Sequence, residues 1–123
     1  MERAAEYAQR RSELHALMLE RANLPTKRFL ALDHDVYQDG ALHRPEKELM
    51  GLVASTVLRC DDCIRYHLIE AVRHGVSEAQ ILEALDIALV VGGSITIPHI
   101  RHALAFLDTI EPENKQSSTR EEA

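Results

Sequence analysis

Apolar residues recur every three to four positions along most of this chain, which is the spacing of an amphipathic α-helix. The clearest case follows the i, i+3, i+4, i+7, i+8 pattern at Leu49, Leu52, Val53, Thr56 and Val57. The same periodicity predicts helices over residues 3–22, 26–38, 45–58, 61–74, 77–91 and 94–110. No segment shows the clean alternation of a half-buried strand. We therefore predict an all-α fold of about six helices.

Proline, glycine and capping residues indicate where these helices begin and end. Pro25 is expected to end the first helical segment, because a residue that precedes proline disfavours helix. Gly75 suits the position just after a helix, and Ser77 with Gln80 three residues later forms the sequence of a capping box. Pro98 predicts either a late start or a kink in the sixth helix.

The chain of 123 residues is of a size that one domain commonly has. We predict a single helical domain over residues 1–110 and a disordered tail over 111–123, where large apolar side chains are missing. Residues 84–91 are apolar almost all round, so the fifth helix is expected to be buried on more than one side. A small subunit cannot cover such a surface alone, which predicts a homo-oligomer.

Composition and charge narrow the class of function. The net charge of −6 argues against a nucleic-acid partner, because nucleic-acid modules are usually basic. The sequence has no apolar run of the length that a transmembrane helix needs, and its first residues show no apolar signal segment. We therefore expect no membrane partner and a cytoplasmic location, and we predict no bound cofactor.

The candidate chemistry lies at Cys60 and Cys63, spaced C-x-x-C, and at His67 one turn later. On a continuous helix these three side chains share one face. A thiol at a helix N-terminus meets the positive end of the helix dipole, which favours the thiolate. Arg59 adds positive charge, whereas the two following aspartates oppose it. A nearby imidazole can take the thiol proton as a general base.

Three interpretations of these residues stay open at this point. The first is redox catalysis by a dithiol. The second is a zinc site with Cys60, Cys63 and His67 as ligands, for which His99 and His102 offer a further pair. The third is two small buried cysteines beside a histidine whose hydrogen bonds are satisfied. Glu48, taken alone, is typical of a solvated surface carboxylate, although crossed packing of its helix would bring it toward His67.

The run K-E-L-M-G-L-V-A-S-T-V-L-R-C-D-D-C-I-R-Y-H, from Lys47 to His67, resembles the alkylhydroperoxidase AhpD-like, carboxymuconolactone decarboxylase superfamily. The resemblance extends over residues 45–104 through H-G-V-S-E-A-Q-I-L-E-A-L and the following glycine pair. It implies a helical subunit that assembles into trimers or hexamers. It also implies peroxide or disulfide reduction in which Glu48, Cys60, Cys63 and His67 form a proton relay.

In this interpretation His67 deprotonates Cys63, Cys60 resolves the product to a disulfide, and a dithiol or lipoyl-type donor reduces it again. The reverse assignment of the two cysteines stays open, because the helix dipole favours the thiolate of the more N-terminal one. Asp62 stands where the redox branch of the superfamily often has histidine, and an acid beside Cys63 is expected to disfavour the thiolate. Two other functions remain as alternatives. One is a zinc-stabilised, non-catalytic interaction module, and the other is cofactor-free chemistry of the decarboxylase kind.

Overall fold

The structure is a computed structural model that describes residues 1–111. Within this range the chain folds into six α-helices and one short 3-10 helix, with no strand, which confirms the all-α prediction. The elements in order are α1 (Ala4–Arg21), α2 (Leu24–Val36), α3 (Arg44–Val57), α4 (Asp61–Arg73), α5 (Glu78–Gly92), η1 (Ser94–Thr96) and α6 (Ile97–Leu107). Apart from residue 111, the predicted tail lies outside the described residues.

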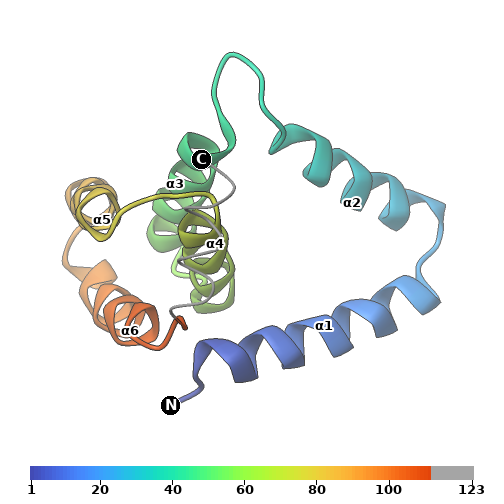
Figure 1. Ribbon diagram of the computed structural model, residues 1–123, viewed down its shortest axis with the longest axis horizontal. Helices are drawn as coiled ribbons and strands as arrows, with labels where there is room; N and C mark the ends of the chain where they lie inside the picture. Colours follow the sequence, from blue (N-terminus) through green and yellow to red (C-terminus); the bar gives the residue numbers. More distant parts are fainter. Residues whose placement is uncertain (112–123) are drawn as a thin grey trace.

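Helices α3 to α6 form the body of the fold (Figure 1). Helix α3 packs against both α4 and α5, and α6 packs against α4. The shared interior is made of fully or almost fully buried apolar side chains, among them Leu52, Leu68, Ile81 and Phe106. Removing these side chains from water is the main source of stability for such a bundle. No helix within residues 1–111 is long and apolar enough to cross a membrane.

Local signals fix several helix ends as expected. Gly75 follows α4 with a positive φ of 88°, and Ser77 and Gln80 form the capping box of α5. Pro98 lies in the first turn of α6, so the helix starts late, after η1. The prediction for Pro25 was wrong in detail. Helix α2 begins before it, because a first-turn proline loses no helical hydrogen bond.

Helices α1 and α2 extend away from the body as an arm, which we define as residues 4–36 (Figure 1). The arm touches the body mainly through the first turns of α1, where Ala4 and Tyr7 are buried. The Tyr7 ring packs edge-on against Phe106 of α6 at a centroid distance of 5.6 Å. Helix α2 buries no residue at all, and its Phe29 is 68% exposed. The arm therefore carries apolar faces that the rest of residues 1–111 leaves uncovered.

Helix α5 is covered on one face only. Ile81, Leu85 and Ala88 pack into the body, whereas Val90 is 84% and Val91 67% exposed. Within residues 1–111 no other element covers the outer side of α5, in line with the expectation that a small subunit cannot cover this apolar run alone. Burial of that side against another copy stays a prediction.

The turn between α3 and α4 is a Schellman motif that ends α3. The N–H of Arg59 donates to the carbonyl of Thr56, and the N–H of Cys60 donates to the carbonyl of Ser55. Such a turn needs a left-handed residue at its centre, usually glycine. Here Arg59 takes that place with φ 61°, the single positive φ of a non-glycine residue within 1–111.

We predict that Arg59→Gly raises the free energy of unfolding by about 1 kcal/mol, because glycine adopts left-handed backbone without the clash of a Cβ atom. Urea unfolding of the reduced protein measures this change. Arg59→Ala is the matched control, since it removes the same charge but keeps the Cβ. If both variants gain equally, charge rather than backbone conformation is responsible.

Candidate active site at the crossing of α3 and α4

A buried ion pair joins α3 to α4. Glu48 is fully buried, and its Oε1 lies 2.8 Å from Nδ1 of His67, which is itself 8% exposed. The interpretation of Glu48 as a solvated surface carboxylate is therefore wrong. The periodicity places Glu48 beside the apolar stripe, and the close packing of α3 on α4 turns that position inward.

Arg44, one turn before Glu48, holds the other carboxylate oxygen. Its Nε donates to Glu48 Oε2 at 2.7 Å. Burial alone raises the pKa of Glu48, but the hydrogen bonds and charges of His67 and Arg44 outweigh it and hold the pKa below its usual value. Glu48 is therefore ionised near neutral pH and only accepts hydrogen bonds. His67 must then donate from Nδ1, which leaves Nε2 of a neutral ring as the acceptor.

The Nε2 edge of His67 lies against Gly51 and Tyr37. A Cβ on Gly51 would stand 2.7 Å from both His67 Nε2 and the Tyr37 hydroxyl oxygen, so only glycine leaves room for both side chains. Burial, followed by the charge of Glu48, raises the pKa of Tyr37, so its hydroxyl stays protonated. No local sequence pattern indicates the role of Tyr37, because its contact with His67 depends on how α2 leads into α3.

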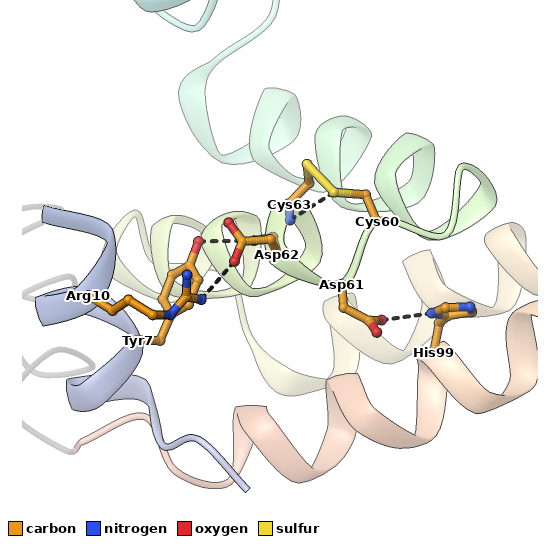
Figure 2. Close-up of a disulfide and its surroundings, with 7 residues drawn as sticks. All are labelled: Tyr7, Arg10, Cys60, Asp61, Asp62, Cys63 and His99. Atoms are coloured by element: carbon orange, nitrogen blue, oxygen red, sulfur yellow. Dashed lines mark hydrogen bonds and ion pairs between the residues drawn. A yellow bond between two sulfur atoms is a disulfide. The ribbon is translucent and has the colours of Figure 1, made fainter. Parts of the chain in front are cut away.

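The two cysteines stand at the start of α4 and are joined by a disulfide (Figure 2). Cys60 is the N-cap of α4, with extended backbone, and its Sγ accepts from the N–H of Cys63 at 3.3 Å. Cys60 thus precedes the first residue of α4 instead of lying within a continuous helix, and its sulfur still meets that of Cys63. Cys63 is exposed, and His67 follows it by one turn of α4.

Both aspartates between the cysteines have a charged or hydrogen-bonding partner from another helix (Figure 2). Asp62 pairs with Arg10 of α1 at 2.8 Å, and the hydroxyl of Tyr7 donates to the Asp62 carbonyl at 2.9 Å. Asp61 accepts from His99 of α6, whose Nδ1 lies 2.7 Å away. The positive charge of Arg10 thus offsets the negative charge of Asp62, which by itself would disfavour a thiolate at Cys63.

The geometry does not support the zinc alternative. Within residues 1–111, no three His, Cys, Asp or Glu side chains are grouped so that they can hold a metal ion. Nδ1 of His67 faces Glu48, and His99 faces Asp61. His67 and His99 therefore each have a carboxylate partner, and Cys60 and Cys63 are joined to one another.

Comparison with known proteins agrees with this fold. The pattern of the carboxymuconolactone decarboxylase family matches residues 25–108, and the chain belongs to this family. An uncharacterized protein, protein 4 in the cox locus of Paracoccus denitrificans, is 37% identical over 83 residues, covering 68% of this chain and 75% of that protein. An uncharacterized protein of Cupriavidus necator is 34% identical over 73 residues, covering 59% of this chain and 65% of its own.

Two crystal structures from Thermotoga maritima show the same fold. One superposes with a TM-score of 0.82 at 60% identity, covering 84% of this chain and 90% of the other. The second superposes with a TM-score of 0.80 at 53% identity, covering 96% and 97%. It is described as a carboxymuconolactone decarboxylase family protein with a possible involvement in an antioxidative response. The family resemblance found in the sequence is confirmed.

The lowered pKa of Glu48 makes stability depend on pH. Because the unfolded carboxyl takes up its proton near the ordinary value of 4.5 and the folded one only at lower pH, the stabilising effect is fully present above pH 4.5 and is lost as pH falls below it. Glu48→Gln is expected to cost about 3 kcal/mol at pH 7, since His67 and Arg44 lose a buried charged partner.

Urea unfolding at pH 7 and pH 3 tests this expectation. The gap between wild type and Glu48→Gln should narrow at pH 3, where the wild-type carboxyl is losing its charge. Exposed Glu20→Gln serves as the control and should follow wild type at both pH values. A gap that stays constant would show that Glu48 contributes through packing rather than charge.

Proposed function

We propose that this protein is a thiol-dependent peroxide or disulfide reductase that works through Cys60 and Cys63. The observation that carries the proposal is the buried hydrogen bond between Glu48 and His67, one helical turn from an exposed redox-capable cysteine. A structural cysteine pair has no need of a buried, oriented imidazole with a free nitrogen beside it. The antioxidative role suggested for the Thermotoga maritima relative points the same way.

In the first half of the cycle the two cysteines are reduced. His67 accepts the proton of the Cys63 thiol, and the thiolate attacks the outer oxygen of a hydroperoxide. The O–O bond breaks, the alcohol leaves with a proton, and Cys63 becomes a sulfenic acid. The thiolate of Cys60 then attacks that sulfur, water leaves, and the Cys60–Cys63 disulfide forms. Two electrons have passed from the dithiol to the peroxide.

The second half restores the thiols. A dithiol donor, such as a lipoyl-type group, attacks the disulfide, forms a mixed disulfide and then closes its own ring as both protein thiols leave. A disulfide substrate would be reduced by the same exchange in the opposite direction. The N-cap position of Cys60 favours this step, because the N–H of Cys63 stabilises a departing Cys60 thiolate.

Glu48 and Tyr37 serve His67 in this scheme. Glu48 orients the ring through Nδ1 and stabilises the imidazolium that forms when His67 takes a proton. The Tyr37 hydroxyl lies on the Nε2 side and keeps its own proton, so it is able to donate toward groups that approach that edge. Because Glu48 stabilises the imidazolium, the proton taken from Cys63 stays on His67 until the leaving group accepts it.

Consumption of tert-butyl hydroperoxide with excess dithiothreitol tests the proposal. Cys63→Ser should abolish turnover. Cys60→Ser, reduced beforehand and then freed of dithiothreitol, should consume one peroxide per chain and remain a sulfenic acid, because no resolving thiol is present. His67→Gln should lower turnover by about 100-fold through loss of the base. Exposed Glu20→Gln is the control and should keep wild-type turnover.

Two results would overturn the proposal. Turnover that survives Cys63→Ser would remove this cysteine from the role of nucleophile. A reaction that survives replacement of both cysteines would indicate chemistry of the decarboxylase kind instead.

We also propose that the protein works as a homo-oligomer in which α2 of one copy lies in an apolar groove of another. Between α3 and α5 the body has a groove of about 820 Å³, lined by Leu49, Met50, Val53, Ile87 and Val91 among others. An isolated helix of the length of α2 is only marginally stable in water. Its exposed face, at Phe29, Leu32 and Val36, has the spacing to fill such a groove.

Charge supports this pairing. Arg28 borders the apolar face of α2 on a helical projection, and Glu46 and Glu83 line the groove. Leu32→Glu should therefore dissociate the oligomer toward the monomer mass of 13.9 kDa, measured by light scattering at micromolar concentration. Ala105→Glu, an exposed charge on the outer side of α6, should leave the assembly intact. A wild-type protein that is monomeric at this concentration contradicts the proposal.

A further inference from the structure

Arg44 is a largely buried cation for which the relay described above has no role. It begins α3, and its side chain is 20% exposed. Its Nε contacts Glu48 at 2.7 Å, and its Nη2 lies 3.4 Å from Glu70 of α4. A charged group in such a place costs desolvation energy, so its partners matter.

These contacts make a continuous row of charges from the site to the surface. His67 contacts Glu48, Glu48 contacts Arg44, and Arg44 contacts Glu70. Glu70 is shared in turn with Arg73 at 3.2 Å and with His74 at 3.5 Å. Arg44 is therefore the one member of the row that contacts carboxylates from both α3 and α4.

Other titratable groups face the same region. A cavity of about 210 Å³ beside Arg44 is lined from α1, from α2 and its end, and from α4 by Arg11, His15, Asp33, His34, Tyr37 and Tyr66. The guanidinium of Arg11 lies over the Tyr66 ring, 4.2 Å from its centroid. Asp33 is exposed. Among residues 1–111, Arg44 and His67 are thus the cationic groups that contact Glu48 directly.

We propose that Arg44 is the positioning residue that keeps Glu48 ionised and thereby sets the pH at which His67 is free to act as a base. This inference rests on the proposed function for its catalytic meaning. Arg44 touches neither the cysteines nor the reacting edge of His67, so it acts only through Glu48.

The direction of the effect follows from the charges. With Arg44 present, the state with neutral His67 holds one cation and one anion and is locally neutral. Without Arg44 the same state leaves the Glu48 carboxylate as an uncompensated buried charge, which favours uptake of a proton by the Glu48–His67 pair. The Glu48–His67 pair then keeps its proton to higher pH, so neutral His67 becomes available as a base only at higher pH.

The experiment compares Arg44→Gln, Arg44→Lys and Arg73→Gln. Arg73 is the matched control, because it pairs with the same Glu70 but does not touch Glu48. Two quantities are measured on the reduced protein. One is the midpoint of the His67 Cε1–H NMR titration, which needs no turnover, and the other is the acid limb of kcat/KM against pH with tert-butyl hydroperoxide.

Arg44→Gln should move both the NMR midpoint and the acid limb about one unit to higher pH. Arg44→Lys keeps the charge and should restore most of the wild-type profile, and Arg73→Gln should leave it unchanged. A uniform loss of rate at every pH with an unmoved NMR midpoint would show a merely structural role and overturn the proposal. An equal shift in Arg73→Gln would also overturn it, because the effect would then not pass through Glu48.

Glu70→Gln keeps the test decisive if Arg44→Gln does not fold. It removes the competing carboxylate, so the charge of Arg44 acts on Glu48 alone and the midpoint should move to lower pH. An unchanged or raised midpoint overturns the proposal.

The proposed function and the role of Arg44 are tested by different results. Wild-type protein that turns over no peroxide or disulfide refutes the proposed function, whereas the NMR titration still decides the role of Arg44.

Discussion

The buried carboxylate of Glu48 is the constraint on which the centre of this structure depends. A charge removed from water must be matched on both of its oxygens, and the two partners come from different helices. His67 can meet Glu48 only if α3 and α4 cross closely, and the missing side chain at Gly51 allows that approach. Packing, electrostatics and the orientation of the imidazole are thus fixed by one group.

Much of this fold could be predicted from the sequence, because helix signals are local. Periodicity, the capping box at Ser77 and the glycine after α4 needed no tertiary information. The contact of Arg44 with Glu48 could also have been predicted, since an Arg–Glu pair four residues apart on a helix is a recognisable pattern. Tyr37 was not, because its place beside His67 depends on the path between α2 and α3. The N-cap state of Cys60 likewise depends on where α3 ends.

The surroundings of the cysteines show why the electrostatic effect of a residue cannot be predicted from its sequence neighbours alone. Asp61 and Asp62 predict an unfavourable setting for a thiolate when they are considered alone. In the fold they bind His99 from α6 and Arg10 from α1, which lie 38 and 52 residues away along the chain. The acid pair therefore also ties the arm and α6 to the start of α4, a role that no local pattern could indicate.

Cys60 belongs to two helices at once, because its N–H closes the final turn of α3 and its Sγ caps α4. Its backbone is held from both sides, so the two sulfurs can separate or join only by rotation of side chains. Opening or closing the disulfide therefore requires no refolding of either helix, and any larger motion of the chain must come from outside the α3–α4 junction.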